Sequence, residues 1–490
     1  MDVGETKTMK IRKTWAAAVF IFGLLFSAPG KADLSVHYEA ENGEWSDKNE
    51  IVMDADASNG RAVGSFSTED AYAAFEITVP SDGFFDLAFR IKKIGGAMKV
   101  NNVYVDGVEA GTITCESGQY DVSVLRNTRL TAGVHRISVQ KDWGYILLDS
   151  MTVTETAGIS ESVYNVQPQL INPRANQETQ ALYRSLCAYF GRCILSGQQC
   201  DDGIDSREFQ IIHALTGKYP AVMGLDMRDY TASRIIAGMN PKAVEHAIAF
   251  HEMGGIVTFC WHWCAPPNTI YDGMDENGNP RWWASFYTKN TSFDIGRVLH
   301  GLDPPGKQLV DEDIRTIAAK LKELEEHHVP VLWRPLHEGS GGWFWWGANG
   351  PEVYKELWIY LYDQLTNVYN CNNLIWVWNG QHPDWYPGDA YVDIIGEDIY
   401  FAPHQYSAYA ADFAELTEYA GKPKIIALSE IAVLPDVDAC IASKASWAWF
   451  CTWKGEYIVR EDGTYSDAYT DLDTLKKVYF SDYVFTLEDL

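Results

Sequence analysis

An acidic side chain among flat aromatic rings marks the stretch of the chain best suited to chemistry. Residues 331–347 read VLWRPLHEGSGGWFWWG, a short apolar run that leads to Glu338, a glycine-rich break and four aromatic residues. Proline and glycine exclude a helix here, so Glu338 is expected where a buried strand passes into a loop. A partly desolvated carboxyl group favours its protonated form, as a general acid at a glycosidic oxygen requires. The rings of Trp343, Trp345 and Trp346 offer apolar faces that can stack on a sugar.

A second carboxylate is normally needed to hydrolyse a glycosidic bond. The apolar run 424–428 follows Gly-Lys-Pro and leads through Ser429 to Glu430, which predicts another buried strand with an acid at its end. One glutamate at a strand end is more often structural or solvated than catalytic. Two such ends, one of them wrapped in aromatic residues, favour a catalytic pair. Glu397 and Asp398, which follow a further apolar run, are rival acids that we interpret as structural.

Together these motifs resemble glycoside hydrolase family 26, whose best-known members are endo-β-1,4-mannanases. The resemblance runs from about Asn172 to the C-terminus and rests on Trp333-Arg334-Pro335-Leu336-His337-Glu338, Trp343 and Leu428-Ser429-Glu430. It implies that Glu338 is the acid/base and Glu430 the nucleophile of a retaining double displacement. The implied substrates are mannan, glucomannan, galactomannan and manno-oligosaccharides, and catalysis needs no cofactor.

Five further residues are candidates for binding substrate. The resemblance implies that His262 contacts sugar beside the cleavage point, that Tyr400 hydrogen-bonds the nucleophile, and that Trp453 forms the floor of the site. Arg334 is always charged, so it is expected to keep the nucleophile ionised. His337 precedes the acid directly, and either binds substrate or supports the site.

A metal site is a weaker interpretation of one motif. Cys260, His262 and Cys264 alternate along a predicted strand and would share one face, as half of a zinc site does. No matching pair of ligands follows at a usable spacing, so the sequence does not support a zinc site.

The elements that must position these residues alternate between strand-like and helical runs, which predicts an α/β (β/α)8 TIM barrel over residues 173–490. Eight strands are predicted, at 193–197, 221–226, 256–260, 331–333, 374–378, 392–396, 424–428 and 447–450. A helix is predicted over 314–324, because its apolar residues repeat with helical spacing. Counting strands places Glu338 after the fourth and Glu430 after the seventh, at the barrel face where such enzymes carry their chemistry.

Residues 33–156 follow a different pattern, which predicts an all-β β-sandwich of the jelly-roll kind. Runs of alternating character recur between turn residues, at 72–77, 85–90, 103–105 and 135–139. The motifs Tyr38-Glu39-Ala40-Glu41-Asn42, Trp143-Gly144-Tyr145 and Leu148-Asp149 resemble carbohydrate-binding module family 35. This resemblance implies a structural calcium held by Glu39, Glu41 and Asp149, whose hard oxygen ligands suit that ion. Trp143 is the expected stacking platform for sugar; the alternatives are a buried core ring and, for the whole domain, a structural spacer.

The N-terminal segment, residues 1–32, has the layout of a secretory signal peptide. Basic residues precede the fourteen uncharged residues Trp15 to Ala28, and cleavage is expected after Ala32. The apolar run is too short to span a bilayer, although a membrane anchor is the alternative. We therefore expect a secreted, extracellular protein. Residues 157–172 form a linker that is not of low complexity, so the two domains are expected to lie near each other.

The charge of the chain excludes several classes of partner. The 490 residues carry a formal net charge of -28, and residues 1–32 contribute five basic and two acidic side chains, which leaves the mature chain near -31. Nucleic acid and anionic membranes would repel such a protein. A neutral polysaccharide suits it, and we expect a monomer. Nine cysteines permit disulfides in a secreted chain, but the sequence does not give their connectivity.

Two alternatives remain open at this stage. Another hydrolase of the family 26 type, a β-1,3-xylanase or a mixed-linkage β-glucanase, would use the same catalytic residues. A protein that binds polysaccharide without cleaving it is a different class, and the intact pair of glutamates argues against it. The sequence does not decide between endo and exo action or the tolerance of galactose branches.

Overall fold

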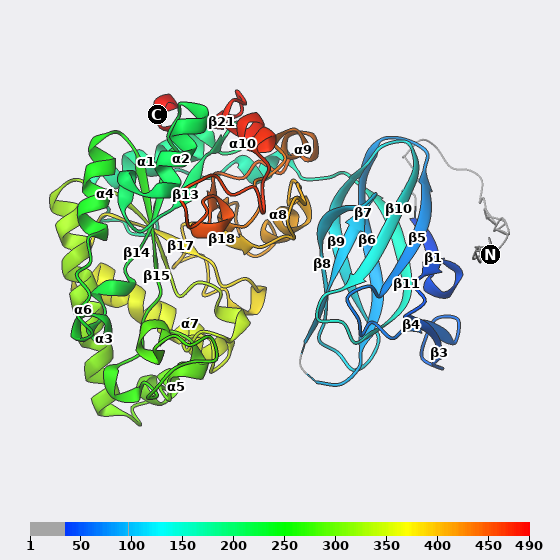
Figure 1. The fold of residues 1–490 in the computed structure, drawn as a ribbon, viewed down its shortest axis with the longest axis horizontal. Coiled ribbons are helices and arrows are strands. Elements are labelled where there is room, and N and C mark those ends of the chain that lie inside the picture. Colours follow the sequence, from blue (N-terminus) through cyan, green and yellow to red (C-terminus); the bar gives the residue numbers. More distant parts are fainter. Residues whose placement is uncertain (1–34, 97) are drawn as a thin grey trace, which may run out of the picture.

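The computed structural model describes residues 35–96 and 98–490, which form a β-sandwich followed by a closed barrel of parallel strands. In Figure 1 the sandwich is drawn in blue and cyan and the barrel in green to red. The predicted fold class, an all-β domain before a (β/α)8 barrel, is confirmed. The predicted signal segment, residues 1–32, lies outside the described residues.

The sandwich consists of two antiparallel sheets, ordered β3-β4-β11-β6-β9 with β1 on β11, and β2-β5-β10-β7-β8. Alternate residues of a strand point to opposite faces, so β6 buries Phe85, Leu87 and Phe89 between the sheets. The strands are β1 (Ser35–Glu39), β2 (Glu44–Trp45), β3 (Glu50–Met53), β4 (Arg61–Gly64), β5 (Tyr72–Val79), β6 (Gly83–Lys93), β7 (Lys99–Val105), β8 (Val108–Cys115), β9 (Asp121–Leu130), β10 (Gly133–Lys141) and β11 (Ile146–Thr156).

The barrel closes in the order β13-β14-β15-β16-β17-β18-β19-β20. Its strands are β13 (Gly197–Gln199), β14 (Val222–Asp226), β15 (Ile256–Trp261), β16 (Val331–Pro335), β17 (Leu374–Trp378), β18 (Ile394–Ile399), β19 (Ile425–Ile431) and β20 (Phe450–Thr452). The α-helices are α1 (Gln177–Tyr189), α2 (Arg207–Thr216), α3 (Ala232–Ile236), α4 (Ala243–Glu252), α5 (Ile295–Leu299), α6 (Pro304–Glu326), α7 (Pro351–Tyr362), α8 (Ala410–Leu416), α9 (Val437–Ser443) and α10 (Leu472–Tyr479).

The first and last barrel strands lie later in the chain than predicted. The predicted strand 193–197 is divided: β12 (Ile194–Leu195) pairs with β21 (Val484–Phe485), and the barrel strand β13 follows it. The apolar criterion missed β13 because it contains two glutamines, and Gln198 donates to the main-chain oxygen of Thr452 at 3.1 Å. The last strand is likewise β20, after the predicted run 447–450.

The long helix α6 shows how the sequence pattern sets the packing. The predicted apolar face is buried, comprising Ile314, Ile317, Ala318, Leu321 and Leu324. Two prolines occupy the first helical positions, where a missing N–H costs nothing, and the Asp303 side chain caps the N–H of Gly306 at 3.0 Å. The helix is thus fixed at its start and along its inner face.

The sandwich packs directly on the barrel, as the composition of the linker predicted. Asn127 of β9 donates to the main-chain oxygen of Ser443 at 3.2 Å, and Arg126 lies 3.2 Å from Glu418. The carboxylate of Glu109 on β8 accepts from the N–H of Ala402 at 3.1 Å. These contacts come from loops and helices on the side of the barrel that α8 covers.

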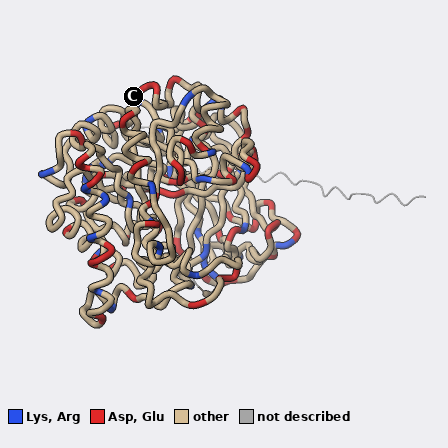
Figure 2. The backbone as a smooth tube through the Cα atoms, turned by 60° about the vertical axis from the view of Figure 1, so that its left-hand side comes forward, with Lys and Arg blue, Asp and Glu red and all other residues tan. Residues whose placement is uncertain are grey.

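Charge and cysteine usage follow the composition. Acidic residues outnumber basic ones and are spread along both domains (Figure 2). All nine cysteines lie within the described residues, and each is a free thiol. Within residues 35–96 and 98–490, no helix combines the length and the apolar character needed to cross a membrane.

Candidate active site

The two predicted catalytic glutamates come together at the carboxyl ends of the barrel strands. Glu430 lies in β19, and Glu338 follows β16 after a sharp turn in which Leu336 and Glu338 both have a φ of 52°. One carboxylate oxygen each from Glu338, Glu430 and Asp398 lie within 4.8 Å of one another. The left-handed backbone at two non-glycine residues carries strain, which is typical of functional sites.

The register of two neighbouring strands brings Asp398 beside Glu430. These residues are directly paired between β18 and β19, after an irregularity in which Ser429 has no partner opposite it. Such a bulge re-aims the side chains that follow it. Asp398 and Glu397 are both predicted to be structural acids, and Asp398 is buried and pairs with Arg334 at 2.8 Å. Glu397 is absent from the carboxylate group, and burial, followed by the charges of Asp412 and Glu415, raises its pKa well above the usual range.

Both oxygens of Glu430 are held by donors. The Arg334 guanidinium forms a close ion pair with Oε1, and the Tyr400 hydroxyl donates to Oε2 at 2.7 Å. Arg334 also donates to Asp398 at 2.8 Å and to Asn379 at 3.0 Å. Only 1% of Arg334 is exposed, so it orients carboxylates rather than reaching a substrate. The carboxylate of Glu430 is therefore fixed in place and aimed into the site.

Glu338 has the surroundings of a proton donor. Burial, and then the nearby charge of Glu430, raise its pKa to about 7. The indole Nε1 of Trp343 donates to Oε2 at 2.7 Å, which orients the carboxyl group. A carboxyl group with this pKa keeps its proton close to neutral pH, where it serves as a general acid.

Only one of the three tryptophans expected to stack on sugar is accessible. Trp343 is 39% exposed beside Glu338, whereas Trp345 and Trp346 are fully buried. The two buried rings pack on each other with centroids 5.5 Å apart, and Trp345 also contacts Trp263. The prediction that all three offer a face to substrate is therefore wrong, because the chain after Trp343 turns back into the core.

The two predicted histidines, His262 and His337, are in contact with each other, and His337 is the more deeply buried. Nε2 of His337 is 3.2 Å from Nε2 of His262, and His337 is only 1% exposed. The backbone turns at Leu336, and the ring of His337 packs against His262, Phe344 and Trp346. Its burial favours support over direct contact with substrate. His262 lies nearer the surface, with its ring centroid 6.0 Å from that of Trp453 on the strand end opposite.

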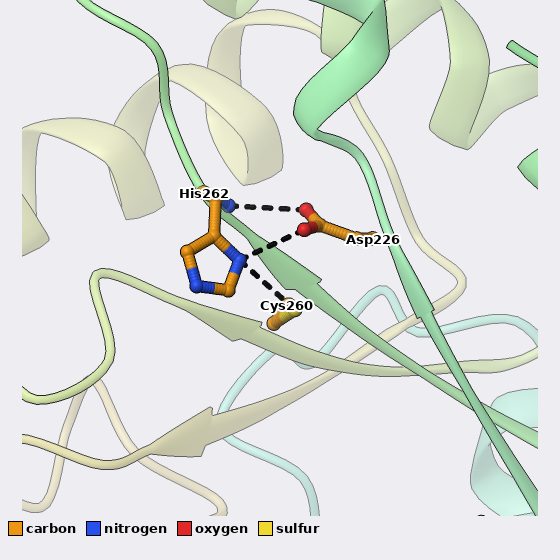
Figure 3. A group of neighbouring side chains, drawn as sticks. All are labelled: Asp226, Cys260 and His262. Atoms are coloured by element: carbon orange, nitrogen blue, oxygen red, sulfur yellow. Dashed lines mark hydrogen bonds and ion pairs between the residues drawn. The ribbon is translucent and has the colours of Figure 1, made fainter. Parts of the chain in front are cut away.

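Cys260 and His262 belong to a group with Asp226 rather than with Cys264 (Figure 3). Asp226, at the end of β14, lies 2.8 Å from Nδ1 of His262, and burial raises the pKa of the Cys260 thiol well above its usual range. A protonated thiol and a mutually bonded Asp–His pair fit a hydrogen-bonded group better than a metal site. Sequence reasoning missed Asp226, although it is another acid that ends a predicted strand.

The sandwich presents the predicted aromatic platform. Trp143 is 49% exposed, which excludes a buried core ring, and Tyr145 beside it is exposed to a similar extent. The Lys99 ammonium group lies 5.3 Å from the ring centroid of Tyr145. This loop between β10 and β11 therefore carries a solvent-facing aromatic surface.

The three predicted calcium ligands do not converge. Asp149 is fully buried: Oδ1 accepts from the N–H of Ser58 at 2.9 Å, and Oδ2 forms a close ion pair with Arg90. Glu39 accepts from the Ser58 hydroxyl at 2.7 Å. Among the described residues, Glu39, Glu41 and Asp149 do not bring their oxygens within 4.8 Å of one another. A guanidinium already supplies the positive charge at Asp149, so the residues as arranged do not fit a calcium ion.

Comparison with known proteins covers both domains. The profile of glycosyl hydrolase family 26 matches residues 171–489, and that of carbohydrate binding module family 35 matches residues 36–156. A mannan endo-1,4-β-mannosidase of Thermothelomyces thermophilus is 37% identical over 454 residues, which are 92% of this chain and 90% of that protein.

Solved structures of similar proteins have the same two-domain extent. A β-(1,4)-mannanase of Podospora anserina with a family 26 domain and a family 35 module is 35% identical, with a TM-score of 0.63 over 93% of this chain and 98% of that one. A ruminal family 26 endo-β-1,4-mannanase is 29% identical, with a TM-score of 0.65 over 95% of this chain and 99% of that one.

The raised pKa of Glu338 makes the stability of the protein depend on pH. Its ordinary value is 4.5 and its folded value about 7, so the folded protein holds this proton more tightly and the free energy of unfolding falls as pH rises between these values. Because glutamine does not titrate, Glu338→Gln should gain about 1–2 kcal/mol relative to the native protein between pH 4.5 and pH 8, allowing for partial exposure. Urea unfolding at both pH values measures this gain.

The matched control is Glu326→Gln, at an exposed glutamate that ends α6. A Glu338→Gln difference that changes with pH no more than that of Glu326→Gln, or that shrinks as pH rises, would contradict the raised pKa.

Proposed function

The chain belongs to glycosyl hydrolase family 26, and we propose that it is a retaining endo-β-1,4-mannanase that cleaves mannan, glucomannan or galactomannan. One observation carries the mechanism: carboxylate oxygens of Glu338 and Glu430 lie within 4.8 Å at the carboxyl ends of two barrel strands. Retaining glycosidases hold their two carboxyl groups about 5–5.5 Å apart, whereas inverting ones leave roughly 6.5–9.5 Å for a water molecule. The mannanases that resemble the chain over more than 90% of its length support the substrate.

In the first half of the reaction, Glu430 attacks the anomeric carbon of a mannosyl unit. Arg334 and Tyr400 hold its two oxygens, so the carboxylate reaches the carbon without rearranging. Glu338 gives its proton to the glycosidic oxygen as the C–O bond breaks, and the shortened chain leaves as an alcohol. The products of this half are a glycosyl ester of Glu430 and an ionised Glu338.

In the second half, Glu338 acts as the base. Its carboxylate takes a proton from a water molecule, whose oxygen attacks the anomeric carbon and displaces Glu430. Two inversions restore the original β configuration. The hydrogen bond from Trp343 keeps Glu338 in place for both proton transfers, because the indole donates to the oxygen that does not need to carry the proton.

The remaining predicted residues surround this pair. Trp343 offers a partly exposed ring beside the acid, and His262 and Trp453 line the site beyond it. On the sandwich, we propose that Trp143 stacks on polysaccharide and keeps the enzyme near its substrate. Its exposure and its place on a loop support this role.

The substrate is tested by incubating the mature protein with unsubstituted mannan, galactomannan, β-1,3-xylan and mixed-linkage glucan, while reducing ends and product lengths are followed. We expect cleavage of the mannans to a ladder of manno-oligosaccharides, and Glu430→Ala should lower kcat/KM by on the order of 10³-fold or more. Cleavage of only another polymer would overturn the substrate, and binding without turnover would support a binding protein.

The matched control for Glu430→Ala is Glu397→Gln. Glu397 lies on the neighbouring strand, is half-buried, and takes no part in the carboxylate group. Since its raised pKa favours the protonated form, glutamine replaces it closely, and mannan cleavage should stay within about twofold of the native rate. Equal losses in both variants would show that the Glu430 effect is structural.

We propose that the enzyme is exported and works as a monomer. The layout of residues 1–32 supports export, and the acidic surface supports a soluble partner such as a neutral polysaccharide. Expression of the full chain with its own N-terminus should release a protein whose first residue is Asp33 and whose mass by light scattering is that of one chain. An uncleaved, membrane-bound product would contradict export, and a doubled mass would contradict the monomer.

A further inference from the structure

We propose that Asp226 is a positioning residue of this active site: it holds the Nδ1–H of His262 and so fixes the tautomer in which His262 meets His337 and the substrate. The inference rests on the proposed function, because it assumes that His262 faces a sugar. Asp226 itself touches neither of the catalytic glutamates. Asp226 acts through His262, and His262 acts through His337.

Asp226 is held rigidly by hydrogen bonds from three directions. Its Oδ1 accepts from the main-chain N–H of Arg228 at 2.8 Å and from that of His262 at 3.1 Å. Its Oδ2 lies 2.8 Å from Nδ1 of His262. Figure 3 shows the carboxylate of Asp226 reaching from the end of its strand to the imidazole and the main chain of His262. Oδ1 of Asp226 therefore binds the main chain, whereas Oδ2 binds the imidazole of His262.

The charge of Asp226 decides the direction of the hydrogen bond. Burial would raise its pKa, but His262, Arg228 and Lys454 outweigh burial and hold it well below the usual range. An ionised carboxylate can only accept hydrogen bonds. Nδ1 of His262 must therefore carry a proton, and in the neutral form of the ring, which has one N–H, Nε2 of His262 carries a lone pair.

The lone pair on Nε2 of His262 faces Nε2 of His337. The two Nε2 atoms are 3.2 Å apart, so one must donate to the other. Burial lowers the pKa of His337 well below its usual range, and the charge of Arg334 acts in the same direction, so this ring is neutral. Its single proton then lies on Nε2 and is donated to His262. Nδ1 of His337 is left as a buried acceptor with no partner among the described residues.

This chain of bonds ends at the residue directly before the acid. His337 precedes Glu338, and its main-chain oxygen accepts from Nε1 of Trp346 at 2.8 Å. A change in the tautomer of His262 therefore acts on the wall of the sugar site and on the histidine that adjoins the acid.

The substitution Asp226→Asn reverses the direction of these hydrogen bonds while keeping the shape of the side chain. The two main-chain N–H groups still require an oxygen at the Oδ1 position, so the new amide nitrogen must face Nδ1 of His262 as a donor. Nδ1 then becomes an acceptor, and the proton of His262 moves to Nε2. There it opposes the Nε2–H of His337, so His337 must move its proton to Nδ1 or the two rings must separate.

The test begins with the native protein and then compares it with the variant. With ¹⁵N-labelled histidine at pH 8, long-range ¹H–¹⁵N spectra should show His262 protonated at Nδ1, and Asp226→Asn should move the proton to Nε2. Kinetics on the polysaccharide that the native enzyme cleaves should show kcat/KM lowered on the order of 10- to 100-fold by Asp226→Asn. A native His262 protonated at Nε2, or an unchanged kcat/KM in the variant, would overturn the proposal.

A double-mutant cycle separates positioning from a general structural effect. If Asp226 acts through His262, Asp226→Asn should cost less than about twofold when added to His262→Ala, whereas full additivity would overturn the proposal. The control Asp229→Asn changes a nearby acid that pairs with Arg234 at 2.6 Å, and should stay within about twofold of the native kcat/KM. If the native protein cleaves no polysaccharide, the proposed function fails, while the spectra still decide the tautomer.

Discussion

The guanidinium of Arg334 is the group on which the arrangement of the site depends. It pairs with Glu430 and Asp398 on two adjacent strands, in a barrel interior that excludes water. One oxygen each from Glu338, Glu430 and Asp398 lie within 4.8 Å of one another. Burial, and then the charge of Glu430, raise the pKa of Glu338. By holding Glu430 in place, Arg334 thus fixes the nucleophile and helps to create the acid.

The fold supplies this geometry through strand register and local strain. Asp398 and Glu430 are direct neighbours between β18 and β19, so any slip of these strands would separate Arg334 from one of its partners. Each catalytic carboxyl group then receives a hydrogen bond from an aromatic side chain, from Tyr400 for Glu430 and from Trp343 for Glu338. The left-handed backbone at Glu338 turns that residue back over the site. The sandwich packs against the barrel beside α8, so its exposed aromatic loop keeps a fixed place relative to the barrel.

The sequence predicted those features that depend on residues close to one another in the chain. Helical spacing identified the buried face of α6, and acids at strand ends drew attention to Glu338 and Glu430. Alternation identified four strands of the sandwich, β5, β6, β7 and β10. Prediction failed where burial is decided by distant residues: Trp345 and Trp346 read as sugar platforms but pack in the core, and β13 is a strand built from buried glutamines. The roles of Asp226 and Asp398 depend on register between strands, which no single stretch of sequence contains. At the predicted calcium site, Asp149 pairs with Arg90 from another strand, a contact that sequence spacing does not show.

The stereochemistry of the first product tests the central claim most directly, because it depends on the separation of Glu338 and Glu430 alone. Hydrolysis of a β-1,4-manno-oligosaccharide is followed by ¹H NMR within the first minutes, before the new reducing end equilibrates in water. A retaining double displacement predicts that the β-anomer appears first and that the α-anomer follows only by mutarotation. Initial formation of the α-anomer would mean a single displacement by water, and would contradict a nucleophilic role for Glu430.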